Sequence, residues 1–344
     1  MVVQSSLDGR LEAGLEWAKQ VLGRRPSQVE SVSSDASFRR YFRLKDDQQS
    51  LILMDAPPDR EPLAPFIDVA SRIKHCVQVP EILSCNVEQG YLLLSDFGSH
   101  PFHQALDENS AGPFFDSALD SLLAMQLQAQ CDGLPSYEPA LLMRELDLFI
   151  DWFVRGHWQV QPSDGELDEW DHLSALLIRW ALDQPQVFCH RDFMPRNLMV
   201  IENGPGILDF QDAVIGPISY DPVCLFRDAF LSWPESRVDE WLETYRRRAE
   251  AAGLGVPADP DLWRRTCDFM GVQRHLKVIG IFARIRYRDG KPRYLEDHWR
   301  FFAYLDHAIE RNPELAGLDD LIKAWSGRRS GRSPDLGSDH LSEQ

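Results

Sequence analysis

The sequence predicts an α+β fold with two lobes: a small lobe built on an antiparallel sheet and a larger, mostly helical lobe. Residues 29–54 contain three short apolar stretches separated by polar turns, which is typical of antiparallel strands. Beyond residue 96, apolar residues recur at helical spacing. The chain of 344 residues also exceeds the usual size of one compact domain. We therefore expect an N-terminal lobe over residues 1–95 and a C-terminal lobe over residues 96–325.

The N-terminal lobe is expected to open with an amphipathic helix, because leucines recur at helical spacing between residues 7 and 22. Gly23 follows as a helix stop. The order after it is three strands, one helix and two strands. The strands are predicted at residues 29–33, 38–44, 51–54, 82–83 and 91–94, and the helix at 66–76.

The C-terminal lobe is expected to be helical apart from one short β interruption. Helices are predicted at residues 114–128, 141–154, 167–182 and through most of 220–325. Between them, three short strands over residues 187–208 include the turn Asn203-Gly204, which favours a hairpin. The last segment, residues 326–344, is rich in serine, glycine and charge, so we expect it to be disordered.

Composition narrows the possible partners. The 36 basic and 54 acidic residues give a formal net charge of −18, which repels nucleic acid and anionic membrane surfaces. The six cysteines are scattered without zinc-site spacing and are expected to be reduced thiols. No signal peptide or membrane span is evident, so we expect a cytoplasmic protein. We expect it to act as a monomer on a small molecule.

The β interruption carries the residues best suited to catalysis. Asp192 follows an apolar strand, Asn197 comes five positions later, and Asp209 stands at the end of the next hairpin. A hairpin returns its end close to its start, so these three oxygen-bearing side chains are expected to converge. Phosphoryl transfer needs a carboxylate beside the attacking hydroxyl and oxygen ligands for Mg²⁺. Asp192 or Asn197 alone could simply cap a turn, but the full order matches a kinase catalytic loop.

With these motifs the sequence resembles the aminoglycoside phosphotransferase-like kinases, which share the bilobal fold of protein kinases. The resemblance covers most of the chain and implies an enzyme that uses ATP and Mg²⁺. It implies that Asp192 is the catalytic base and that Asn197 and Asp209 bind Mg²⁺. The residues expected to support the loop are His190, Arg191 and Asp221.

The nucleotide is expected to bind the N-terminal lobe. The turn at residues 33–37 lacks glycine, but Ser34, Asp35 and Ser37 could present backbone amides and hydroxyls to phosphate; an ordinary polar hairpin is the alternative. Ser95 and Phe97 lie in the expected hinge between the lobes, whose backbone would bind adenine. Asp96-Phe97-Gly98 spells the metal motif of protein kinases, but it precedes the catalytic loop, so Asp209 is the expected metal ligand.

The third strand lacks the lysine that kinases use to hold the α- and β-phosphates. Met54 occupies its neighbourhood. Arg39, Arg40 or Arg43 on the adjacent strand could supply the positive charge instead, because neighbouring strands are close enough for long side chains to substitute. We take Arg40 as the first candidate.

Four fragments, at residues 34–42, 54–58, 189–199 and 273–284, resemble one branch of this family. That branch comprises bacterial kinases of N-acetylmuramate and N-acetylglucosamine that act in cell-wall recycling. The resemblance implies phosphorylation of the anomeric C1 hydroxyl to the α-1-phosphate. Muramate also bears a carboxylate, for which Arg274, Lys277 and Arg284 are candidate partners.

The sugar contacts that we expect are Glu145, Trp152, Arg274 and Lys277. An aromatic ring can stack on a sugar, although aromatic residues at helical spacing, such as Trp152, are more often core residues. Arg274 and Lys277 share a helix face and could instead lie along the surface.

Two other functions stay open at this point. A kinase of another small alcohol, such as an aminoglycoside, choline or homoserine, would suit the negative net charge because some of these substrates are cations. A nucleotide-binding regulator without kinase activity is suggested by the missing lysine and glycines. The presence of Asp192, Asn197 and Asp209 together argues against the regulator.

Overall fold

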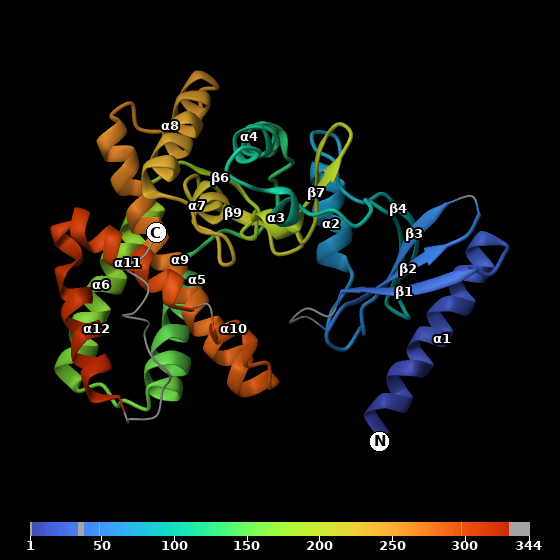
Figure 1. The fold of residues 1–344 in the computed structure, drawn as a ribbon, viewed down its shortest axis with the longest axis horizontal. Coiled ribbons are helices and arrows are strands. Elements are labelled where there is room, and N and C mark those ends of the chain that lie inside the picture. The colour runs from blue at the N-terminus through green and yellow to red at the C-terminus, as the bar shows by residue number, and fades with distance from the viewer. Residues whose placement is uncertain (1, 34–37, 48, 297, 330–344) are drawn as a thin grey trace. The chain divides into compact units, whose positions relative to one another are not determined.

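The computed structural model of the protein describes residues 2–33, 38–47, 49–296 and 298–329. Its contacts group the chain into two compact units, one formed by Met1–Gln130 and Arg196–Asp212, the other by Cys131–Pro195 and Ala213–Gln344. Figure 1 labels most of the helices and strands of both units. The chain crosses between units three times, so the units differ from a single division after residue 95. That lobe boundary stays a prediction.

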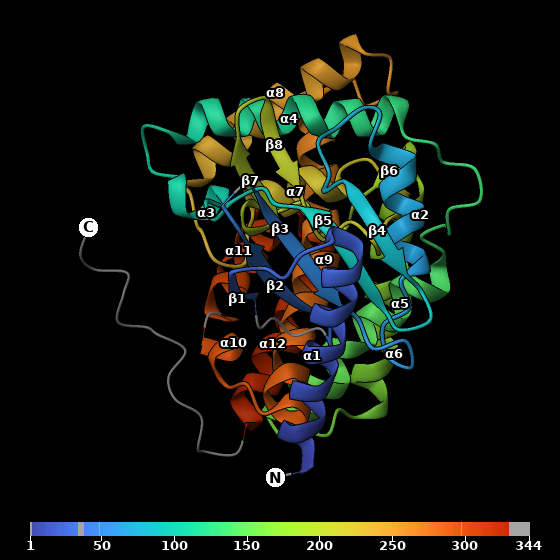
Figure 2. The same ribbon diagram turned by 90° about the vertical axis from the view of Figure 1, so that its right-hand side faces the viewer.

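The first unit contains a five-stranded antiparallel sheet with the strand order β1-β2-β3-β5-β4. Alternate side chains of β2 and β3, among them Phe42 and Leu53, are buried in one cluster with Leu15 and Ala18 of helix α1 (Val2–Leu22). Helix α1 therefore packs against one face of the sheet (Figure 2). The strands are β1 (Gln28–Ser33), β2 (Arg40–Lys45), β3 (Ser50–Asp55), β4 (Ile82–Asn86) and β5 (Tyr91–Ser95).

A second sheet in this unit is the hairpin predicted from Asn203-Gly204, formed by β7 (Leu198–Ile201) and β8 (Gly204–Ile207). The backbone N–H of Val200 donates to the carbonyl of His100 at 2.8 Å, and that of Ile207 to Gln78 at 2.8 Å. The hairpin is thus fixed to the first unit along both of its strands. The helices of this unit after α1 are α2 (Ala64–Ile73), α3 (Phe102–Ala105) and α4 (Ala111–Gln128).

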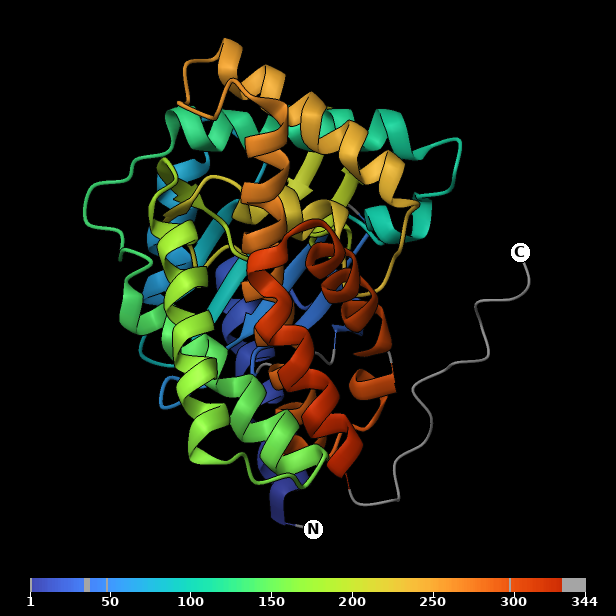
Figure 3. The ribbon, with the colours of Figure 1, turned by 90° about the vertical axis from the view of Figure 1, so that its left-hand side faces the viewer.

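The second unit is mostly helical, as predicted. Its longest helix, α9 (Pro260–Asp289), contacts α5, α6, α7, α8, α10 and α11 and forms the centre of the unit (Figure 3). A two-stranded ribbon pairs β6 (Gln186–Cys189) with β9 (Val214–Pro217). The other helices are α5 (Pro139–Leu148), α6 (Asp164–Leu182), α7 (Tyr220–Phe226), α8 (Glu235–Ala251), α10 (Arg293–Glu296), α11 (His298–Arg311) and α12 (Ala316–Arg328).

The α+β fold class, with an antiparallel sheet followed by a mostly helical remainder, is confirmed. Helix α12 extends past residue 325, where the helical lobe was expected to end, and residues 330–344 of the expected disordered tail lie outside the described residues. Within the described ranges, no helix has both the length and the apolar character needed to cross a membrane.

The continuous α-helix predicted at residues 141–154 is wrong in its second half. Helix α5 ends at Leu148, and a π-helix, η1 (Phe149–His157), continues the chain. Helix α9 passes very close to this junction, because a Cβ atom on Gly280 would lie 2.3 Å from the carbonyl carbon of Leu148. Apolar periodicity does not distinguish hydrogen bonds between residues i and i+4 from bonds between i and i+5, so the sequence did not indicate the π-helix.

Substitution of Gly280 by alanine tests this close approach. Alanine normally stabilises a helix interior by about 1 kcal/mol relative to glycine. At Gly280 the added methyl group would meet backbone, so we expect the free energy of unfolding to fall by about 1–3 kcal/mol in urea denaturation. Gly165→Ala in α6 is the matched control, since nothing lies within 4 Å of its Cβ position. A Gly280→Ala variant as stable as the control would contradict the observed packing.

Candidate functional site

The expected catalytic loop begins where strand β6 ends, and Asp221 of α7 fixes its backbone. The buried carboxylate of Asp221 accepts the N–H of His190 at 2.7 Å and that of Arg191 at 2.9 Å. Burial raises the pKa of Asp221, although His190 and these two N–H groups act in the opposite direction. Asp221 therefore lies where a residue that supports the loop is expected.

Arg191 has an unusual backbone conformation directly before the expected base. Its φ of +73° lies in the left-handed region, which costs a non-glycine residue roughly 1–2 kcal/mol. The N–H of Asp192 donates to Nδ1 of His190 at 3.2 Å, and the carbonyl of Asp192 accepts the N–H of Met194 at 2.9 Å. Both backbone groups of Asp192 are thus hydrogen-bonded, so the backbone that carries its carboxylate is fixed by the loop.

The side chain of Arg191 leads to a buried acid, Glu145 of α5, which is only 5% exposed. Glu145 accepts hydrogen bonds from Arg191 Nη2, from the Tyr137 hydroxyl, and from Gln273 Nε2 at 3.2 Å. It also forms an ion pair with Lys277 Nζ at 2.9 Å. Burial alone would raise the pKa of Glu145, but Lys277 and Arg191 outweigh it and hold that pKa below its usual value.

Three of the four side chains expected to contact the sugar, Glu145, Arg274 and Lys277, are buried. Arg274 is 1% exposed, and its guanidinium donates to the carbonyl of Arg227 and to the sulfur of Cys224, each at 3.1 Å. Lys277 donates to the Tyr220 hydroxyl at 3.0 Å in addition to its bond with Glu145. Their burial favours support of the catalytic loop over direct contact with a sugar. Trp152 lies on η1, partly buried against the hydrophobic core.

The two expected metal ligands lie together in the first unit, at the base of the β7–β8 hairpin. Asn197 Nδ2 lies 3.4 Å from Asp209 Oδ2, and the N–H of Leu208 donates to the carbonyl of Asn197 at 2.9 Å. Gln211 Nε2 donates to Asp209 Oδ1 at 2.9 Å. Asp209 is exposed and has a φ of +63°, so its backbone too is held in the left-handed region.

This pair suits Mg²⁺ bound together with a nucleotide. Among the described residues, no group of three or more His, Cys, Asp or Glu side chains could hold a metal by itself. Mg²⁺ at kinase sites is commonly bound through one or two carboxylates, with phosphate and water oxygens completing its shell. The Asp209 carboxylate and the Asn197 side-chain oxygen supply hard oxygen ligands of the required kind.

The residues expected to bind the nucleotide are only partly described. Ser34, Asp35 and Ser37 lie outside the described residues. Ser95 pairs with Glu81: its N–H donates to the Glu81 carbonyl at 3.0 Å, and its hydroxyl accepts the Glu81 N–H at 2.9 Å. The ring of Phe97 packs so closely on Gly206 of β8 that a Cβ there would lie 2.5 Å from it. The hinge segment is thus fixed to both the sheet and the hairpin.

The three arginines considered in place of the missing lysine all form ion pairs. Arg40 shares the fully buried carboxylate of Asp55 with Arg10, which donates from its Nε at 2.9 Å. Arg43 Nε pairs with Asp96 at 2.6 Å and its Nη2 donates to the Gly98 carbonyl. The third pair joins Arg39 to Glu61 at 2.9 Å.

Several partners of the site were missed in the sequence. Tyr137, Gln273 and Gln211 each bond to an expected site residue, and Arg10 shares Asp55 with Arg40. Gln273 could have been found, because it precedes Lys277 by four positions and so shares its helix face. No local pattern links Glu145 to Arg191, which is 46 positions away.

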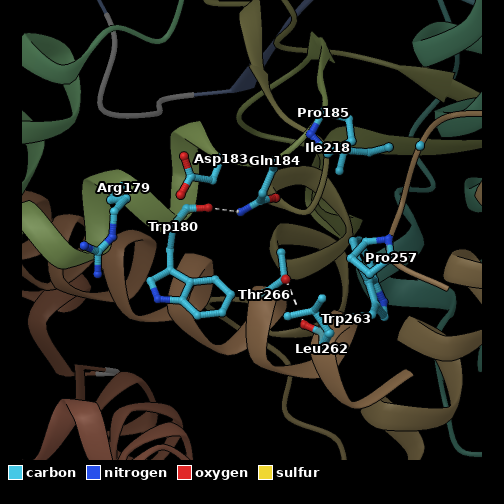
Figure 4. A pocket seen from close by; sticks show the side chains of 11 residues that line it. Arg179, Trp180, Asp183, Gln184, Pro185, Ile218, Pro257, Leu262, Trp263 and Thr266 are labelled. Carbon is cyan, nitrogen blue, oxygen red and sulfur yellow. Dashed lines mark hydrogen bonds between the residues drawn. The ribbon is translucent and has the colours of Figure 1, made fainter. Parts of the chain in front are cut away.

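A cavity of about 450 Å³ lies elsewhere in the second unit and includes none of the expected site residues (Figure 4). Pro185 and Ile218, which flank the β6–β9 ribbon at the end opposite the catalytic loop, are part of its wall. Gln184 crosses this end of the ribbon, since its Oε1 accepts the Ser219 hydroxyl at 2.6 Å and its Nε2 donates to the Trp180 carbonyl. The cavity therefore lies away from Asp192.

The fold is that of the kinase-fold proteins. It is similar to an aminoglycoside phosphotransferase solved with ADP and hygromycin B, at a TM-score of 0.60 and 14% identity, over 87% of this chain and 98% of that one. Residues 28–265 match the model of the phosphotransferase enzyme family. The chain belongs to that family, and the predicted phosphotransferase is confirmed.

Two relatives from pseudomonads are much more similar in sequence. Each bears the name N-acetylmuramate/N-acetylglucosamine kinase. The protein of Pseudomonas aeruginosa is 50% identical over 86% of this chain and 88% of its own length. The protein of Pseudomonas putida is 50% identical over 85% of this chain and 86% of its own length.

The variant Glu145→Gln tests whether this carboxylate holds the loop. It would leave Arg191 and Lys277 buried without their anion, so we expect the free energy of unfolding to fall by about 3–5 kcal/mol in urea denaturation. Glu138→Gln, which changes an exposed residue just before α5, should change it by less than about 0.5 kcal/mol. The double variant Glu145→Gln/Lys277→Met removes one stranded cation and should recover part of the loss. Equal stability of Glu145→Gln and Glu138→Gln would refute the role.

Proposed function

We propose that the protein is an ATP-dependent sugar kinase that phosphorylates the anomeric C1 hydroxyl of N-acetylmuramate and N-acetylglucosamine to the α-1-phosphate. The observation that carries this proposal is the 50% identity, over most of both chains, to relatives named for these two sugars. Membership of the phosphotransferase family supports the reaction class. We place this reaction in cell-wall recycling, in the cytoplasm.

Asp192 is the proposed general base. The C1 oxygen attacks the γ-phosphorus of ATP, the new O–P bond forms as the bond to the bridging oxygen of ADP breaks, and the hydroxyl proton passes to the Asp192 carboxylate. An anomeric hydroxyl is more acidic than other sugar hydroxyls, so a carboxylate suffices as acceptor. His190, Arg191 and Asp221 hold the backbone that carries Asp192.

Asn197 and Asp209 would hold Mg²⁺, which supplies positive charge to the phosphates of ATP. The nucleotide is proposed to contact Ser34, Asp35 and Ser37 through its phosphates, and Ser95 and Phe97 through its adenine.

Arg40 is the proposed replacement for the missing lysine. Arg40 lies on β2 directly opposite Asp55 of β3, so its guanidinium belongs to the strand next to the one that lacks the lysine. A guanidinium at this place on the sheet suits the negative charge of a nucleotide phosphate.

Phosphorus NMR of the reaction with each sugar tests the proposal, because it reports both turnover and the position phosphorylated. A C1 phosphate is expected from both sugars. Asp192→Asn should lower kcat by about 10²–10⁴-fold while nucleotide affinity, measured by calorimetry, is retained. Asp171→Asn, which changes an exposed carboxylate on α6, is the matched control and should keep full activity.

Two outcomes would overturn the proposal in different ways. Turnover of an aminoglycoside, choline or homoserine, without turnover of either sugar, would indicate another small alcohol as the substrate. Nucleotide binding without turnover of any hydroxyl compound would indicate a regulator.

A further inference from the structure

Arg284 of helix α9 is a half-buried arginine whose charge is not balanced. Its Nε is buried without a hydrogen-bond partner, and no ion pair of its guanidinium occurs within residues 2–33, 38–47, 49–296 and 298–329. Three other cations of this helix have hydrogen-bond or ion-pair partners, whereas Arg286 has a ring contact with Tyr287. Lys277 pairs with Glu145, Arg274 donates to a carbonyl and a sulfur, and Arg288 pairs with Asp289 at 2.7 Å.

The half-buried charge of Arg284 is unfavourable in free energy unless an anion binds it. Burial lowers the pKa of Arg284, and the nearby charge of Arg288 lowers it further, against a smaller opposite effect of Asp289. A guanidinium that has lost part of its water without gaining a partner carries a desolvation cost. A carboxylate can remove that cost by forming two parallel N–H···O bonds with the planar guanidinium.

Arg284 lies on the same face of helix α9 as Lys277, which is linked to the expected catalytic loop. Arg284 follows Lys277 by seven residues, almost two full helical turns, so the two side chains share a face about 10 Å apart along the axis. Lys277 is joined through Glu145 to Arg191, the residue before Asp192. A substrate that extends from Asp192 along this face of α9 would therefore approach Arg284.

The segment from α5 into η1 runs beside α9 in the same direction and carries an aromatic side chain, Trp152. Glu145 bonds to Lys277, Leu148 lies against Gly280, and His157 Nδ1 lies 2.7 Å from the Tyr287 hydroxyl. Later residues of one segment contact later residues of the other. The part of η1 beside Arg284 therefore lies between Leu148 and His157. Trp152, which we expected to contact the sugar, belongs to that stretch.

We propose that Arg284 binds the carboxylate of N-acetylmuramate and so sets the preference of this enzyme for muramate over N-acetylglucosamine, which has no such group. This inference rests on the proposed function and adds to it the residue that separates the two substrates. Arg274 and Lys277 are paired inside the unit, whereas Arg284 is half-buried and its Nε has no hydrogen-bond partner. The class of ligand is an amino sugar that carries a carboxylate on a ring substituent other than the C1 hydroxyl.

The test is the ratio of kcat/KM for N-acetylmuramate to kcat/KM for N-acetylglucosamine, measured for the unmutated protein and for Arg284→Met. Methionine removes the charge and keeps an unbranched apolar chain. We expect the ratio to fall by about 10- to 100-fold, through a higher KM for muramate, since a charged hydrogen-bonded pair is lost. Arg284→Lys, which keeps the charge, should restore part of the ratio.

Arg286→Met is the matched control. Arg286 lies one half-turn further along α9, with its guanidinium 5.7 Å from the centre of the Tyr287 ring, and its loss should leave the ratio within about twofold. A ratio that Arg284→Met leaves unchanged, or an equal loss with both sugars, would overturn the inference while the proposed function stands. Absence of turnover of either sugar by the unmutated protein would overturn both.

Discussion

The expected catalytic loop is joined to the helices of the second unit through the buried carboxylate of Glu145. The carboxylate of Glu145 accepts hydrogen bonds from the Tyr137 hydroxyl, the catalytic loop and helix α9, and two of its partners, Arg191 and Lys277, are cations. Each of these cations would be costly to bury alone, so they and the acid stabilise one another only when loop and helices are assembled. The position of Asp192 is therefore coupled to the packing of α5 against α9.

The backbone is strained at two residues of the expected site. Arg191, directly before Asp192, and Asp209 both have positive φ angles, at +73° and +63°. Each costs free energy that the surrounding structure must offset, and residues in such conformations concentrate at functional sites. Asp221 offsets the strain at Arg191 by accepting two backbone N–H bonds. Next to Asp209, the N–H of Leu208 donates to the carbonyl of Asn197 at the base of the β7–β8 hairpin.

The sequence predicted those features whose signal is local. The Asn203-Gly204 pair predicted the hairpin, although its turn lies at residues 202–203 and Gly204 begins β8. Short apolar stretches predicted β2 and β3, and the spacing of Asp192 and Asn197 predicted the loop. It did not predict the partners of Glu145, because they come together only in the folded chain. It also favoured solvent or substrate for Arg274 and Lys277, since charged side chains are rarely fully buried, whereas tertiary pairing makes their burial possible.

An acidic protein must bind an anion through local rather than overall charge. Although the formal net charge is −18, residues 273–293 contain seven lysines and arginines and a single acidic residue. Repulsion by distant surface carboxylates is screened over roughly 10 Å of salt solution, whereas a half-buried guanidinium acts at contact and is screened much less. The net charge therefore opposes the approach of ATP and of a carboxylated sugar, and the few cations placed at contact distance decide whether they stay bound.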